Sequence, residues 1–142
     1  MLYTEKTKLA MKIAYDAHKD QFDKCGMPYI FHPIHLAEQL QTEDTTIVAL
    51  LHDVVEDTAM TFDDLSSKGF SYNVITALKL LTHDKSVDYF EYVSLIKGNP
   101  IASSVKLADL KHNSDLSRLD TITEKDVARK EKYEKAIQIL CE

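Results

Sequence analysis

The chain has 142 residues, of which 44% are hydrophobic, so it can bury one core but is too short for two ordinary domains. Its formal net charge is -6, and only two of its 17 basic residues, Arg118 and Arg129, are arginines, which argues against a nucleic-acid-binding protein. No apolar run is long enough to cross a membrane and the first residues lack the apolar stretch of a secretion signal, so we expect a cytoplasmic protein.

Helical spacing and few helix-breaking residues predict an all-α fold. The sequence has 3 Gly and 3 Pro and no internal repeat. Apolar residues recur at intervals of three and four through most of its length. We therefore expect one compact helical bundle of about eight helices, formed by residues 1–142. The two cysteines, Cys25 and Cys141, lie far apart without a metal-binding spacing, so we expect two reduced thiols.

The first segment of chemical interest surrounds His32. Thr4 can cap a first helix that runs to about residue 22, and Pro28 with the glycine before it predicts a loop. Pro33 stands at a favourable first helical position, which would make His32 the N-cap of a second helix. A side chain held in a fixed direction suits a metal ligand. A histidine at a helix start is also an ordinary structural choice, and this segment alone favours that interpretation.

Residues 47–58, IVALLHDVVEDT, concentrate four ionisable groups. We predict one helix here, with an apolar arc and an opposite arc formed by His52, Asp53, Glu56 and Asp57. No basic residue lies among the three acids, so they would repel one another unless a cation or a shared proton compensated them. A metal site and an ordinary solvent-facing helix both remain open at this point.

Capping residues indicate where the later helices begin. Thr61 with Asp64, and Thr123 with Asp126, have the spacing of capping boxes. Gly69 and Gly98 are expected to close two of these helices. The expected N-caps, in chain order, are Asp44, Thr61, Ser71, Ser86, Asn99 and Thr123.

A further acid, Asp109, lies in the segment VKLADLKHN. Lys106 precedes it by one helical turn and Asn113 follows it by one. The simplest interpretation is a surface ion pair between Lys106 and Asp109. Leucines and an alanine flank Asp109, however, which is a more apolar setting than an exposed acid usually has.

Histidines and carboxylates with no thiolate nearby favour a mixed nitrogen and oxygen site for Mn²⁺, Fe²⁺ or Zn²⁺. Such an ion lowers the pKa of bound water and neutralises phosphoryl oxygens, and a neighbouring carboxylate can take the proton of the water. These are the parts of a phosphohydrolase. The sequence by itself does not indicate that the candidate ligands converge.

Four segments occur in a characteristic order: AHKDQFDKCGMPYIFHP (17–33), LLHDVVEDT (50–58), LKLLT (78–82) and VKLADLKHN (105–113). In sequence, order and separation they resemble the HD-domain hydrolase module of the RelA/SpoT-type (p)ppGpp 3′-pyrophosphohydrolases. The resemblance covers most of residues 5–118. It implies a single HD-type phosphohydrolase domain over residues 1–142.

The family reaction removes the 3′-pyrophosphate of ppGpp or pppGpp, giving GDP or GTP and pyrophosphate, with one Mn²⁺ as the implied cofactor. The separate synthetase domain of the family has no counterpart in this sequence, which implies a small, hydrolase-only form. The oligomeric state stays open, a homodimer being one alternative. By position, the implied metal ligands are His32, His52, Asp53 and Asp109, the residues that activate and orient water are Glu56 and Asp57, and the candidate substrate-binding residues are Lys24, Lys106, Lys111 and Asn113.

Departures from the family pattern concern the substrate. Asp23 stands where the family usually has an arginine against the guanine base, which removes a planar contact and an attraction to an anion. Leu110 and Asp115 replace polar or basic partners of the substrate, and Lys111 and Arg118 could compensate. The implied metal ligands therefore match the family, whereas several residues at the substrate-binding positions differ. Replacing Asp23 by Arg would then lower the KM for ppGpp.

Three hypotheses follow from the sequence. The first is a Mn²⁺-dependent alarmone 3′-pyrophosphohydrolase. The second is an HD phosphohydrolase acting on a different nucleotide or a phosphorylated cofactor, motivated by Asp23, Leu110 and Asp115. The third is a non-catalytic module that senses a nucleotide, which the presence of Glu56 and Asp57 disfavours because a binder would not need them.

Overall fold

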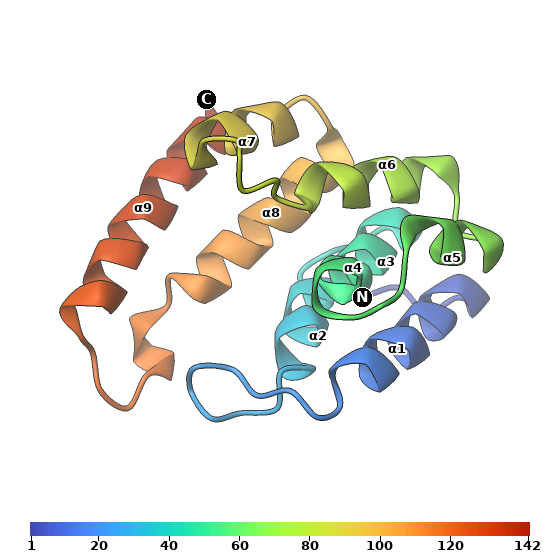
Figure 1. Ribbon diagram of the computed structural model, residues 1–142, viewed down its shortest axis with the longest axis horizontal. Coiled ribbons are helices and arrows are strands. Elements are labelled where there is room, and N and C mark those ends of the chain that lie inside the picture. Colours follow the sequence, from blue (N-terminus) through green and yellow to red (C-terminus); the bar gives the residue numbers. More distant parts are fainter.

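The computed structural model describes all residues, 1–142, as an all-helical protein (Figure 1). This confirms the predicted all-α fold. The α-helices are α1 (Glu5–His18), α2 (Phe31–Glu38), α3 (Glu43–Leu51), α4 (Val54–Asp57), α5 (Phe62–Ser67), α6 (Tyr72–Leu81), α7 (Tyr89–Ile96), α8 (Pro100–Asn113) and α9 (Glu124–Cys141), and η1 (Leu116–Arg118) is a 3-10 helix. None of these helices combines the length and the apolar character that a membrane crossing demands.

Helix α3 forms the centre of the bundle. Its last six residues, from Thr46 to Leu51, are all buried. A helix that is apolar on every side has to be enclosed, and α3 contacts α1, α2, α6 and α8. The residues that directly follow α3, His52 and Asp53, are thereby carried into the interior of the molecule.

Helix α8 connects the two sides of the molecule (Figure 1). It packs against α2, α3 and α6 on one side and against α9 on the other, while α7 contacts both α8 and α9. The expected start of α8 is confirmed, because Pro100 is its first residue and the side chain of Asn99 accepts a hydrogen bond from the backbone of Ala102. Asp109 therefore lies on a helix that is covered by other helices on two sides.

The predicted central helix is wrong in one respect, because it is broken at the His52–Asp53 pair. Helix α3 ends at Leu51 and α4 begins at Val54, and Asp53 has φ -106° and ψ 0°, outside the helical region. The break accounts for the one α-helix beyond the expected eight. Because the chain changes direction here, His52 and Asp53 lie at the buried end of α3. They do not lie on a solvent-facing side of a continuous helix.

The start of α2 also differs from the prediction. The helix begins at Phe31 and its N-cap is Ile30, so His32 is the second helical residue and not the cap. Pro33 is accommodated as the third residue, where a backbone N–H would have no partner within the helix. His35 is exposed, as its position on the opposite face implies.

Most of the expected N-caps accept the predicted backbone hydrogen bonds. Asp44 and Ser86 do not cap a helix. Thr42 forms a capping box with Thr45 that starts α3 two residues before Asp44 could, and Ser86 instead donates hydrogen bonds to the carboxylate of Asp84. The confirmed caps are Thr4, Thr61, Ser71, Asn99 and Thr123, and the two additional ones are Thr42 and Asp88.

Candidate metal centre

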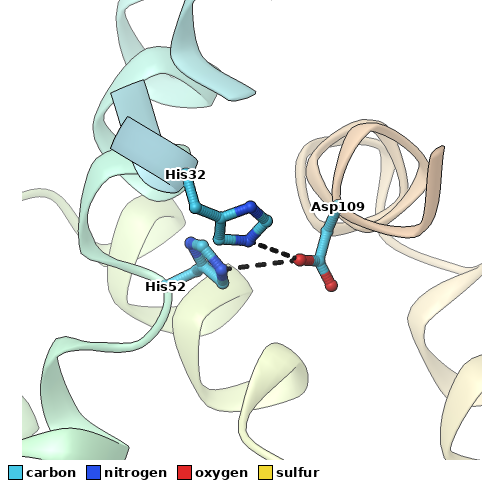
Figure 2. Close-up of side chains that lie close together, drawn as sticks. All are labelled: His32, His52 and Asp109. Carbon is cyan, nitrogen blue, oxygen red and sulfur yellow. Dashed lines mark hydrogen bonds and ion pairs between the residues drawn. The ribbon is translucent and has the colours of Figure 1, made fainter. Parts of the chain in front are cut away.

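His32, His52 and Asp109 come from three separate segments and meet in the interior (Figure 2). One potential ligand atom of each residue lies within 4.8 Å of those of the other two, and all three residues are buried. The oxygen Oδ1 of Asp109 is 2.9 Å from Nε2 of His32 and 3.8 Å from Nε2 of His52. Two imidazoles and a carboxylate form a donor set typical of a first-row divalent metal.

A backbone hydrogen bond orients the imidazole of His52. Its Nδ1 lies 2.7 Å from the carbonyl oxygen of Ala49, to which it donates, so its Nε2 faces the other two side chains. Nε2 is buried and has no hydrogen-bond partner, since Oδ2 of Asp53 lies 3.1 Å away without hydrogen-bond geometry. A buried nitrogen without a partner is costly in a folded protein. This nitrogen fits a metal ligand.

The electrostatics of the cluster favour a bound positive charge. Burial by itself lowers the pKa of His52, but the charges of Asp53 and Asp109 outweigh it and raise that pKa to about 9. Burial opposes ionisation of the two acids, yet His52 beside Asp53, and Lys106 beside Asp109, hold the pKa of each carboxyl well below its usual range. In the protein without metal, a proton on His52 supplies part of the charge that a cation would provide.

Asp53 lies next to the tightest group and not within it. It follows His52 at the break between α3 and α4, and its Oδ2 accepts a hydrogen bond from the hydroxyl of Tyr29. The side chain is about one quarter exposed, at 24%. Of the four predicted ligands, the structure thus brings three together and places the fourth beside one of them.

Asp109 has further partners. The ammonium of Lys106 lies 3.0 Å from its Oδ2, and Nδ2 of Asn113 donates to its Oδ1 at 2.9 Å. The side chains of Lys106 and Asp109 are only 15% and 10% exposed, so the expected surface ion pair is instead a buried one. Burial lowers the pKa of Lys106, but Asp109 outweighs this and raises it. Two of the predicted substrate-binding residues, Lys106 and Asn113, therefore hold Asp109.

A cavity of about 480 Å³ opens beside the cluster. Its lining includes Asn113 and all four predicted metal ligands. Both arginines of the chain also lie in it, although the net charge of the protein is -6. The cationic residues of the lining are Lys24, Lys106, Arg118, Arg129 and Lys132. The lining also contains six acids, and ion pairs join Lys106 to Asp109, Arg118 to Asp23 and Arg129 to Asp126. Lys24 and Lys132 are the cations of the lining that pair with no carboxylate, so they are the ones left for an anionic ligand.

The two predicted water-activating residues differ in position. Glu56 lines the cavity, and its Oε1 accepts a hydrogen bond from the backbone N–H of His83 at 3.1 Å. Partial desolvation raises the pKa of Glu56, and the pKa of Asp57 is raised by desolvation and by the charge of Asp53. Asp57 is not part of the cavity lining. A carboxylate with a raised pKa is the better proton acceptor.

Lys111 lies away from this cavity. It is exposed and lines a separate cavity of about 640 Å³ between α2 and α8, together with His35 and His112. Lys24, by contrast, lines the cavity beside the metal cluster. Desolvation and the nearby charge of Arg129 lower the pKa of Lys24. The structure therefore separates these two predicted substrate-binding residues.

The sequence interpretation missed what Asp23 does. Its Oδ1 accepts hydrogen bonds from the backbone N–H groups of Cys25 and Met27 at 2.8 and 3.0 Å, and its Oδ2 is 3.2 Å from Nη2 of Arg118. Arg118 also donates from Nη1 to the carbonyl of His112 at 2.9 Å. In an Asx turn, an aspartate side chain accepts a hydrogen bond from the backbone N–H two residues later, so an aspartate in a loop indicates this local role. No local signal indicated the partner 95 residues away.

His112 is a second residue that the sequence interpretation missed. Its Nδ1 lies 2.7 Å from Nδ1 of His32, and the two rings are stacked with centroids 5.0 Å apart. Burial, with a contribution from Arg118, lowers the pKa of His112 to about 4, so the ring is neutral near pH 7. One of the two nitrogens donates to the other, which orients the imidazole of His32.

Comparison with known proteins places the chain among alarmone hydrolases, although no family model matches it. It is 28% identical over 145 residues to the guanosine-3′,5′-bis(diphosphate) 3′-pyrophosphohydrolase of Aquifex aeolicus, covering 94% of this chain and 20% of that protein. It is 42% identical over 65 residues to the bifunctional (p)ppGpp synthase/hydrolase SpoT of Escherichia coli, covering 43% and 9%. The chain therefore spans a fifth or less of the length of these two relatives.

Two smaller relatives match over most of their length. The guanosine-3′,5′-bis(diphosphate) 3′-pyrophosphohydrolase MESH1 of Danio rerio is 38% identical over 122 residues, which are 76% of this chain and 67% of that protein. A metazoan ortholog of SpoT that hydrolyses ppGpp has a similar solved structure, with a TM-score of 0.75, 27% identity and coverage of 99% of this chain and 88% of the other. The resemblance of the four sequence segments is confirmed, and the chain belongs to the family of guanosine-3′,5′-bis(diphosphate) 3′-pyrophosphohydrolases.

Proposed function

We propose that this protein removes the 3′-pyrophosphate of ppGpp or pppGpp, and that His32, His52, Asp53 and Asp109 hold one divalent cation, Mn²⁺, with Fe²⁺ and Zn²⁺ as alternatives. The observation that carries the proposal is the convergence of two imidazoles and a carboxylate in a cavity that also contains both arginines. Membership of the family supplies the reaction. The two free cysteines support the expected cytoplasmic location.

The donor set fits a divalent cation on two grounds. Nitrogen and carboxylate ligands suit Mn²⁺, Fe²⁺ and Zn²⁺. The buried Nε2 of His52 faces the carboxylates of Asp53 and Asp109 and makes no hydrogen bond within the protein. When bound, the cation would neutralise charge on the phosphoryl group and lower the pKa of a water molecule. The acids Asp53 and Asp109 support this assignment, because their charges already favour a positive charge at His52.

Glu56 accepts the proton of the attacking water in this proposal. Its carboxylate lines the cavity, and its raised pKa favours uptake of a proton. The oxygen of water adds to the phosphorus that is bonded to the ribose 3′ oxygen. The bond between that phosphorus and the ribose oxygen breaks, and the ribose oxygen takes up a proton. Asp57, the next residue of α4, would help to orient the water.

The cations of the cavity lining serve to bind the phosphates of the nucleotide. Desolvation and the charge of Arg129 lower the pKa of Lys24, and the charge of Asp126 raises it, so these three charged groups lie close together. Asp126 pairs with Arg129 at 3.0 Å, and a phosphate would give the two cations a second anionic partner. Asn113 and Lys106 contribute through Asp109, which both of them contact. Lys111, in the separate cavity, would serve only a substrate that reaches beyond the first one.

The test is an assay of Mn²⁺-loaded protein with ppGpp, pppGpp, deoxynucleoside triphosphates and NADPH, in which pyrophosphate and orthophosphate are measured separately. The proposal expects pyrophosphate and GDP in equal amounts from ppGpp, and much slower release from the other compounds. Asp53→Ala is the matched variant and should lose both the metal and the turnover. Faster release from a different compound would replace ppGpp as the substrate, and no release from any of them would contradict the activity.

A further inference from the structure

Tyr29 joins the loop after α1 to the metal cluster. Its backbone N–H donates to the carbonyl of Gln21 at 2.8 Å, and its own carbonyl accepts from the backbone N–H of His32 at 2.9 Å. Its side chain is largely covered, and its hydroxyl donates a hydrogen bond to Oδ2 of Asp53. The residue thus contacts one predicted ligand through its backbone and another through its side chain.

Besides Tyr29, the carboxylate of Asp53 contacts one other side chain, His52, whose Nε2 lies 3.1 Å from its Oδ2. Asp53 occupies the N-cap position of α4, where an aspartate usually accepts a hydrogen bond from a backbone N–H of the first turn. Its side chain makes no such bond. The ion-pair contact with Nε2 of His52 lacks hydrogen-bond geometry, so the hydroxyl of Tyr29 is the one hydrogen-bond donor to this carboxylate.

The ring of Tyr29 is itself held in place. The edge of the His18 imidazole packs against it with centroids 4.8 Å apart, and the ring of His32 lies at 5.6 Å on a tilt of 52°. His18 is only 1% exposed and is fixed by a contact of 2.9 Å between its Nδ1 and Oε1 of Gln21. A hydroxyl on an immobilised ring sets the direction of its acceptor.

We propose that Tyr29 is a positioning residue of the metal centre, whose hydroxyl orients the carboxylate of Asp53 toward the point where His32, His52 and Asp109 converge. The inference rests on the metal site of the proposed function and adds a residue outside its ligand set. A neutral donor orients a carboxylate without removing its charge, so the acid stays available to a cation.

The test is the affinity of the whole chain for Mn²⁺, measured by competition with a fluorescent chelator. Tyr29→Phe removes only the hydroxyl and should weaken Mn²⁺ binding by about 10-fold or more, the usual effect of losing a partner of a metal ligand. Tyr92→Phe is the matched control, because the hydroxyl of Tyr92 donates at 2.5 Å to the carbonyl of Leu81, outside the ligand set. It should keep the wild-type affinity.

Circular dichroism and denaturation curves establish that both variants are folded. A folded Tyr29→Phe protein with wild-type affinity for Mn²⁺ would overturn the proposal. A loss of affinity of the same size in Tyr92→Phe would overturn it as well, since the effect would then follow from removing any buried tyrosine hydroxyl near the cavity.

A double-mutant cycle identifies the route of the effect. The background is Asp53→Asn, which unlike Asp53→Ala keeps an oxygen ligand and therefore a weaker, measurable affinity for Mn²⁺. In it, Tyr29→Phe should change that affinity by less than about twofold, because the carboxylate that it orients is gone. An equal loss in both backgrounds would show that Tyr29 acts by another route, and would contradict the proposal. Because the cycle measures metal binding, its outcome is separate from that of the proposed activity: wild-type protein that binds Mn²⁺ without hydrolysing ppGpp contradicts the activity alone.

Discussion

Replacement of Lys106 by methionine tests how the charge of Asp109 is compensated. The ammonium lies 3.0 Å from Oδ2 of Asp109, and both side chains are almost fully buried. At this distance the attraction is about 5 kcal/mol for an effective dielectric constant of about 20. Part of it is offset because the ammonium no longer has to be buried, and His32 and Asn113 still donate to Asp109. We expect the free energy of unfolding to fall by about 3 kcal/mol in the protein without metal.

Bound metal should reduce this loss. A divalent cation at the cluster compensates Asp109 in place of Lys106, so with saturating Mn²⁺ the difference between wild type and Lys106→Met should shrink to about 1 kcal/mol. The assay is urea denaturation of both proteins, with a chelator and with Mn²⁺. Lys130→Met is the matched control, since Lys130 pairs with Glu134 at 3.9 Å on the surface.

The control should change the free energy of unfolding by less than about 0.5 kcal/mol in either condition. Equal effects of Lys106→Met and Lys130→Met would refute the argument that a buried carboxylate depends on its partner. A loss in Lys106→Met that is the same with the chelator and with Mn²⁺ would refute the claim that the cation binds at Asp109.

Three further changes test other parts of the account. Glu56→Gln should leave Mn²⁺ affinity unchanged and slow ppGpp hydrolysis by about 100-fold or more, measured as kcat, because it removes the proton acceptor; an unchanged kcat would exclude that role. Asp23→Arg should lower the KM for ppGpp, as expected from the sequence, because it puts a second guanidinium beside Arg118 and a phosphate can bind both; an unchanged KM would contradict this. Its melting temperature should fall and should recover in the charge-swapped Asp23→Arg/Arg118→Asp protein; failure to recover would show that the pair does not matter. Thr123→Ala should lower the free energy of unfolding by about 1 kcal/mol through loss of the α9 cap, and Thr123→Ser should not.

Local chemistry made much of the fold predictable. Capping residues such as Thr61 and Thr123 are followed by their partners three residues later, so a pattern of four residues predicts where the helix starts. The apolar arc predicted within residues 47–58 indicated a helix that packs on the core, but not that α3 is enclosed on every side. The break after Leu51 was missed because the helical period continues through it; tertiary packing, rather than a glycine or proline, ends the helix at His52 and Asp53.

The site was predictable where residues act through their own chemistry, and not where they act through distant partners. The side-chain types of His32, His52 and Asp109 indicate ligands wherever they converge. The spacing within α8 indicated the ion pair of Lys106 with Asp109, but its burial depends on the elements packed around α8. The ion pair of Asp23 with Arg118 joins elements far apart in the chain, for which one sequence carries no local signal.

The central claim is that four side chains share one divalent cation. The most direct measurement is an anomalous difference map from crystals of the protein grown with Mn²⁺. The account predicts a single strong peak within coordination distance of His32, His52, Asp53 and Asp109. A peak elsewhere, or a cation that His32, His52 and Asp109 bind while Asp53 stays out of reach on Tyr29, would contradict it.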